Sequence, residues 1–108
     1  MAAVAFLTLT AQILHRHGEV KSFLKNEIPR ARRVLGESHD TTFTMRWVYA
    51  EALCKDEGAT VNDLREGVET LEDTVRIARR VLGNSHPTVA GIEESLGHFQ
   101  AALNTIIT

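Results

Sequence analysis

The stretch ARRVLGESH at residues 31–39 returns as ARRVLGNSH at residues 78–86, 47 positions further along the chain. Eight of the nine positions are identical, and the single difference replaces Glu37 by Asn84. A near-identical internal copy in a chain of this length is typical of a repeat protein. One repeat unit cannot bury its own apolar face, so units stack on one another and build an extended surface. We therefore expect stacked repeats, whose surface usually holds another protein.

Composition favours one small, soluble, helical domain. The 108 residues suffice for a single domain, and 44% apolar with 24% charged residues is ordinary for a globular protein. The net charge of −2 gives no general attraction to nucleic acid or to anionic membranes. A lone cysteine, Cys54, excludes an intrachain disulfide and is typical of a small core residue in a reducing compartment. We expect an intracellular protein, located in the cytoplasm or in an organelle.

Apolar residues recur at helical spacing along almost the whole chain and predict five consecutive helices. Their approximate ranges, read from the apolar stripes, are 2–16, 19–35, 40–56, 64–82 and 87–106. Pro29 lies inside the second of them and should bend that helix or split it in two. Because the connections are short, successive helices should be antiparallel neighbours in an all-α fold.

The ends of the predicted helices carry recognisable turn and capping residues. Gly36 and Gly83 should each end a helix, in a turn with positive φ. Asp40 is a good N-cap for the third helix, and Ser85 or His86 should cap the fifth. Both copies of the repeated stretch are therefore expected to make the same turn between two helices.

The third helix is apolar on two sides, so it should lie between other helices. One side carries Phe43, Trp47, Ala50 and Cys54, and the opposite side carries Met45, Val48 and Ala52. We expect Trp47 to be largely buried between the second helices of the two repeats.

The repeated stretch and the residues after it resemble a junction found in one family of helical repeats. The residues are RRVLG-x-SH at 32–39 and RRVLG-x-SHPT at 79–88. They resemble the long tetratricopeptide (TPR) repeats of the kinesin light chain type. The resemblance implies antiparallel helical hairpins stacked as a short TPR-like solenoid of about five helices. Within one domain, 1–108, it divides the chain into a first hairpin at 1–39, a second hairpin at 40–86 and a capping helix at 87–108.

The sequence departs from that family in three respects, one of which is that it keeps little of the family's signature of small and aromatic residues inside the repeat. Asp40 stands where the family has proline, and the period of 47 residues is longer than the 34 of an ordinary TPR repeat.

The resemblance implies a non-catalytic scaffold or adaptor that binds a partner protein or peptide. The ligand would lie in a groove lined by polar residues of the first helix of each hairpin. Those residues would be Gln12 and His15 on the first helix, and Arg46 and Tyr49 on the third. The alternative for all four is an ordinary surface position.

A second function class stays open. The first predicted helix and residues 101–107 are very apolar, and two and a half repeats are few for a stable stack. In this second class the chain would be a structural subunit, packed into a larger assembly or self-associated through its apolar terminal helices.

The arginine pairs of the repeated stretch also have two interpretations. Arg32, Arg33, Arg79 and Arg80 lie in the last turn of their helices, where positive charge stabilises the carboxyl end of the helix dipole. The alternative is a basic ridge that contacts an acidic partner.

No pattern in the sequence predicts catalysis. The five histidines fit no standard zinc spacing, and neighbouring carboxylates such as Glu93 and Glu94 point in different directions on a helix. Acidic residues share the helices that carry the arginines, which argues against a surface for nucleic acid. The apolar residues 1–14 are fewer than the roughly 20 that a membrane span needs. We therefore expect no enzyme activity, no cofactor, no metal ion, no nucleic-acid partner and no membrane span.

Overall fold

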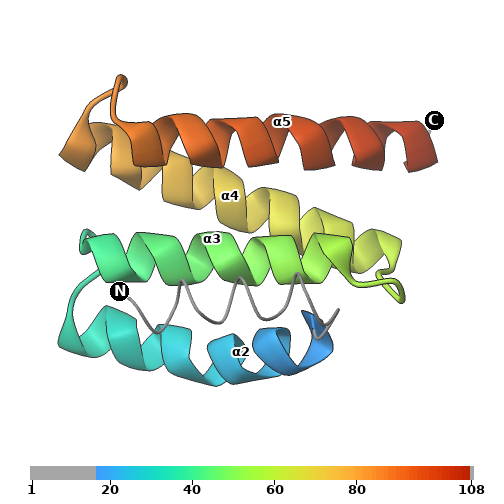
Figure 1. Cartoon of the computed structure of the whole chain (residues 1–108), viewed down its shortest axis with the longest axis horizontal. Helices are drawn as coiled ribbons and strands as arrows, with labels where there is room; N and C mark the ends of the chain where they lie inside the picture. The colour runs from blue at the N-terminus through green and yellow to red at the C-terminus, as the bar shows by residue number, and fades with distance from the viewer. Residues whose placement is uncertain (1–16, 108) are drawn as a thin grey trace.

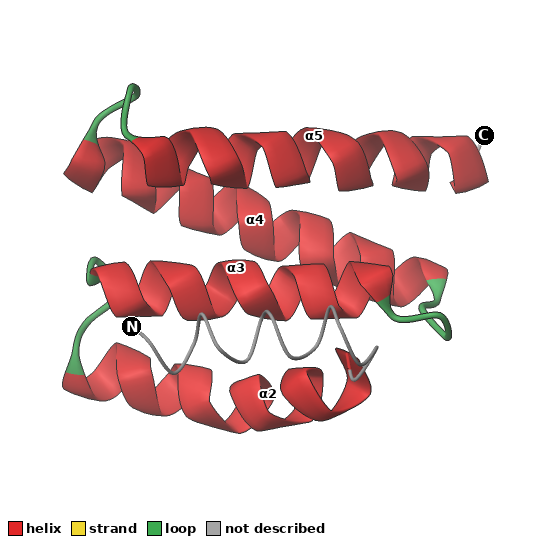
Figure 2. Ribbon diagram, viewed as in Figure 1, coloured by secondary structure: helices red, strands yellow, loops and turns green. Residues whose placement is uncertain are grey.

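The structure is a computed structural model that describes residues 17–107 as four α-helices joined by short connections (Figure 1). The helices are α2 (His17–Val34), α3 (Asp40–Lys55), α4 (Val61–Leu82) and α5 (Pro87–Ile107). Strands are absent from this part of the chain (Figure 2), so the all-α prediction is confirmed for it. The predicted helix at about 2–16 lies outside the described residues. None of the four helices is long and apolar enough to cross a membrane.

Successive helices run in opposite directions and pack side by side, as the short connections predicted (Figure 1). Helix α3 packs on α2 and on α4, and α4 packs on α5. A smaller contact joins α3 directly to α5. Helix α3 is therefore the central element, and its opposite sides belong to two different layers.

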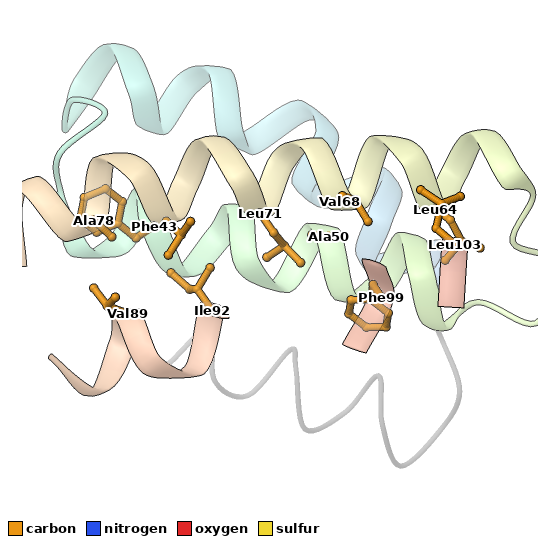
Figure 3. Close-up of a cluster of buried hydrophobic side chains, with 11 residues drawn as sticks. Phe43, Ala50, Leu64, Val68, Leu71, Ala78, Val89, Ile92, Phe99 and Leu103 are labelled. Carbon is orange, nitrogen blue, oxygen red and sulfur yellow. The ribbon is translucent and has the colours of Figure 1, made fainter. Parts of the chain in front are cut away.

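Two apolar clusters lie on the two sides of α3, so the predicted pair of faces is confirmed. The first cluster joins α2 to α3 and contains Val20, Leu24, Ile28, Ala31, Met45, Val48, Tyr49, Ala52 and Leu53. The second joins α3, α4 and α5 (Figure 3) and contains Phe43, Ala50, Leu64, Val68, Leu71, Val75, Ala78, Val89, Ile92, Phe99 and Leu103. Fully burying one such large side chain contributes about 1.5–3 kcal/mol. Packing on both sides therefore fixes the position of α3.

Helix α2 continues through Pro29 as a single helix, so a split at that residue is wrong. Pro29 is exposed, whereas Ile28 beside it is buried in the first cluster. The ring thus points away from the core, and the helix loses only the hydrogen bond that a proline nitrogen cannot donate. Burial of the opposite face holds the two halves together.

The two copies of the repeated stretch make the same turn, as predicted. Gly36 has φ 94° and Gly83 has φ 92°, a region that favours glycine. The amide of Gly36 donates to the carbonyl of Arg32 at 3.1 Å, and that of Gly83 donates to the carbonyl of Arg79 at 3.0 Å. Each glycine therefore ends its helix with the same backbone hydrogen bond.

The helix after each turn is capped by a histidine. His39 Nδ1 accepts a hydrogen bond from the Thr41 amide at 3.0 Å, and His86 Nδ1 accepts one from the Thr88 amide at 3.1 Å. The prediction of Asp40 as N-cap is wrong: it is the first residue of α3, where its carboxylate still stabilises the positive end of the helix. Of the two candidates for the fifth helix, His86 makes the cap.

Helix α4 begins in a different way, with a reciprocal capping box. The Asp63 amide donates to Thr60 Oγ1 at 3.1 Å, and the Thr60 amide donates to Asp63 Oδ2 at 3.0 Å. This pair satisfies two amides that the first turn of a helix leaves without partners. Helix α4 consequently starts at Val61, three residues before the apolar stripe that predicted it.

Candidate functional site

A groove of about 500 Å³ runs between α3 and α5 and is open to solvent. Its lining is Trp47, Glu51 and Lys55 from α3, and Gly91, Glu94, Ser95, His98 and Phe99 from α5. The α3 residues are four apart, so they form one stripe along the helix. The groove therefore joins residues that are about 40 positions apart in the sequence.

Trp47 forms one wall of the groove and links the two helices. Its indole Nε1 donates to Ser95 Oγ at 2.9 Å. Gly91 makes room for the ring, because a Cβ at that position would lie 2.4 Å from Trp47 Cη2. Trp47 is partly buried and packs against α5, so the expected position of the ring between α2 and α4 is wrong.

The rest of the groove combines carboxylates, one lysine and aromatic rings. Glu51 and Lys55 form an ion pair one helical turn apart, with Oε2 and Nζ at 3.0 Å. Glu94 is exposed and forms no ion pair within residues 17–107. The ring of His98 stands edge-on to Phe99, with centroids 5.2 Å apart at 73°. The groove thus presents apolar ring surface beside charged groups, of which Glu94 has no ion-pair partner within residues 17–107.

Arg46 and Tyr49, the predicted groove residues of the third helix, lie on the other side of α3. Arg46 is 8% exposed and Tyr49 is 7% exposed, so neither is an ordinary surface position. Adjacent residues on a helix point about 100° apart, which turns Arg46 away from the groove that Trp47 lines. Whether Arg46 and Tyr49 contact a partner stays a prediction, and Gln12 and His15 lie outside the described residues.

Tyr49 is held by a carboxylate of α4. Its hydroxyl donates to Glu66 Oε2 at 2.5 Å. Burial raises the pKa of Tyr49 above its usual range, and the hydrogen bond to Glu66 raises it further. Tyr49 is therefore a protonated donor that ties α3 to α4.

Cys54 of α3 packs closely against Gly67 of α4. A Cβ on Gly67 would lie 2.4 Å from Cys54 Sγ and 3.2 Å from the carbonyl oxygen of Ala50. Burial raises the pKa of Cys54 to about 12, with further contributions from Glu51 and Asp63. The thiol stays protonated at neutral pH and is a poor nucleophile. Within residues 17–107, no group of three or more His, Cys, Asp or Glu side chains is placed to hold a metal ion.

Sequence reasoning missed most of the groove. It identified Trp47 as a packing residue but did not single out Glu51, Lys55, Ser95 or His98. A usable signal was the four-residue spacing that places Glu51 and Lys55 on the stripe of Trp47. Comparison of the chain with protein-family models, with curated proteins and with solved structures finds no match.

Proposed function

We propose that the chain is a non-catalytic protein-interaction scaffold of the TPR type, in which the groove between α3 and α5 receives a segment of a partner protein. The observation that carries the proposal is the equivalence of the two turns. Gly36 and Gly83 share their φ angle and their backbone hydrogen bond, and His39 and His86 make the same cap. Two equivalent turns 47 residues apart support a repeated helical hairpin.

The place of the groove supports the same proposal. If each turn joins the second helix of one hairpin to the first helix of the next, α3 and α5 are successive first helices. In TPR-type hairpins the ligand side is lined by first helices, and α3 and α5 supply all the residues that line this groove. Repeat proteins use such extended concave surfaces for binding.

The chemistry of the groove suits a peptide better than a small apolar ligand. It is open, and it mixes the rings of Trp47 and His98 with the charges of Glu51, Lys55 and Glu94. Aromatic side chains give contact area at low entropic cost, and the polar groups can pair with the backbone or side chains of a bound segment.

Selection of peptides from a random library against the full chain tests the proposal. Trp47 is the only tryptophan, so its fluorescence reports directly on the groove. We expect selected peptides to change Trp47 emission and to bind at least about tenfold more weakly to the Glu94→Ala/His98→Ala variant. Lys25→Ala, an exposed change on α2, is the matched control and should leave affinity unaltered. Equal affinity for all three proteins, with unchanged emission, would contradict the proposal.

The alternative is a structural subunit of a larger assembly. Ile106 is 54% exposed and Ile107 is 52% exposed at the carboxyl end of α5, which favours an apolar contact there. A mass measurement in solution separates the two functions. A monomer that stays soluble alone supports the scaffold, whereas a chain soluble only as an oligomer or with a partner supports the subunit.

A further inference from the structure

The first of the two equivalent turns carries a buried arginine that no described residue hydrogen-bonds. The Arg46 side chain is 9% exposed, and the nearest carboxylate oxygen, Asp73 Oδ2, lies 3.9 Å from its guanidinium. That distance is too long for a hydrogen bond. Within residues 17–107 its guanidinium, which has five N–H donors, donates no hydrogen bond. A buried guanidinium that donates no hydrogen bond lowers the stability of the folded chain. A bound anion would remove this cost by accepting those hydrogen bonds.

Both neighbouring carboxylates are already engaged by other arginines. Glu37 Oε1 accepts from Arg32 Nε at 2.8 Å and also from the terminal nitrogen of the same guanidinium. Asp73 Oδ1 accepts from Arg76. Of the three arginines in this group, Arg46 is therefore the one that forms no hydrogen bond with either carboxylate.

The second turn shows what occupies the equivalent place when the charges balance. Arg79 corresponds to Arg32 and Glu93 corresponds to Arg46 at the same offset of 47 residues. Arg79 and Glu93 form an ion pair, with nitrogen and oxygen 3.1 Å apart. In the first turn, two arginines stand where the second turn has an arginine and a glutamate. Burial lowers the pKa of Arg46, and the positive charges of Arg32 and Arg76 lower it further, whereas the carboxylates of Asp73 and Glu37 raise it.

We propose that the first turn is an anion-recognition site, in which a carboxylate from an acidic segment of a partner protein binds the Arg46 guanidinium beside Arg32 and Arg76. A planar guanidinium forms two parallel hydrogen bonds with a carboxylate, which suits the donors that Arg46 leaves unused.

The surroundings favour a single carboxylate over a phosphate. Glu69 and Glu72 line an adjoining open pocket of about 320 Å³ together with Asp73 and Arg76. Their negative charges oppose an anion with two charges more strongly than an anion with one. The site lies on the α4 side of α3, apart from the α3/α5 groove. Binding at this site can therefore be tested independently of binding in the groove.

The Arg46→Glu variant tests the proposal, because it replaces the guanidinium donors by a carboxylate that repels an anion. The probe is a short acetylated and amidated peptide with a single glutamate between glycines, and its neutral match has glutamine in that place. Binding is measured by calorimetry with the full chain at constant ionic strength. We expect the wild-type chain to bind the glutamate peptide, and Arg46→Glu to bind it at least about tenfold more weakly. Arg33→Glu makes the same charge change at an exposed neighbouring arginine and should keep the affinity within about twofold.

Thermal unfolding guards against a trivial loss of binding through misfolding. The unfolding temperature of Arg46→Glu should lie above the temperature of the binding measurement, which shows that the variant is folded when its affinity is determined. If that variant does not fold, Arg46→Met, which removes the charge and keeps much of the volume, takes its place. Equal peptide binding by wild type and variant would overturn the proposal, as would no binding by wild type. Tighter binding of inorganic phosphate than of the glutamate peptide would overturn the assignment to a carboxylate.

Discussion

The turn at residues 31–46 and the turn at residues 78–93 share a backbone but differ in their neighbours. Both end a helix with a glycine at φ above 90° and start the next helix with a histidine cap. The differing positions include Thr42 against Val89 and Arg46 against Glu93. The comparison teaches that the shared residues determine the turn, whereas the others determine what packs against it.

Thr42 and Val89 illustrate how differing residues support the same turn. Thr42 Oγ1 donates to the carbonyl of Gly36 at 2.8 Å, a bond that valine cannot make. In the second turn the carbonyl of Gly83 accepts instead from the amide of His86 at 3.4 Å. Thr42 and Val89 are both fully buried, so this position lies inside the apolar packing of either turn. The backbone turn does not depend on the hydroxyl.

The largest expected effect comes from moving a residue of the first copy into the second. Gly91 occupies the place that Thr44 has in the first copy. Gly91→Thr drives a side chain into Trp47 and should destabilise the chain by about 1–3 kcal/mol, because a packed contact cannot absorb the added atoms. Urea unfolding measures the loss, and Trp47 emission should shift as the ring is displaced.

Thr44→Gly is the matched reverse change. It should cost no more than about 1 kcal/mol, the usual penalty for glycine inside a helix. If Gly91→Thr were as mild as Thr44→Gly, the close approach of Trp47 to α5 would be disproved.

The next effect tests the identity of the two turns directly. Gly36→Val and Gly83→Val should each destabilise the chain by about 1–2 kcal/mol, because a β-branched residue is strained at positive φ. A Cβ meets no atom within 4 Å at either position, so the backbone strain alone sets the cost. Unfolding of both variants in urea should give equal losses. A loss at one glycine and none at the other would show that the turns differ.

Removal of the histidine caps should have a smaller effect. His39→Ala and His86→Ala each leave an amide of the first helical turn without its acceptor. We expect a loss of about 1 kcal/mol for each, as for other N-cap replacements. His39→Asp and His86→Asp supply a different acceptor and should restore the stability measured by thermal unfolding. Failure of aspartate to rescue either variant would argue against a capping role.

The smallest expected effect concerns the capping box of α4, which uses a carboxylate where the other two caps use a histidine. The hydrogen bond from the Thr60 amide lowers the pKa of Asp63, so the folded state favours the carboxylate. Its contribution is present above the pKa that Asp63 has in the unfolded chain, and it is lost as the pH falls through the lower, folded value. Asp63→Asn should therefore be less stable than wild type at pH 7. The difference should shrink as the pH falls below about 4, and a difference independent of pH would exclude the carboxylate.

Local patterns in the sequence predicted much of the fold. The apolar stripes located α2 to α5, and Gly36 and Gly83 marked two helix ends, because periodicity and turn chemistry depend on near neighbours. The cap of α3 was misassigned because Asp40 is the better N-cap by statistics, while the turn after Gly36 brings His39 into the capping position.

Contacts between helices were harder to predict. The α3/α5 groove brings Glu51 together with Glu94 and His98, and their proximity follows only from how α4 spaces the two helices. Arg46 was expected to line a ligand groove because the resemblance to TPR hairpins places polar residues of the first helices there. Its burial follows from the packing of α3 against α2 and α4, which no pattern within α3 reveals.

An experimental structure of the full chain tests the central claim, the equivalence of the two turns, most directly. The measurement is the superposition of residues 31–43 on residues 78–90. The account predicts positive φ at both Gly36 and Gly83, with His39 and His86 Nδ1 each accepting the amide two residues further on. An unbroken helix through either glycine, or a different capping residue at one turn, would contradict it.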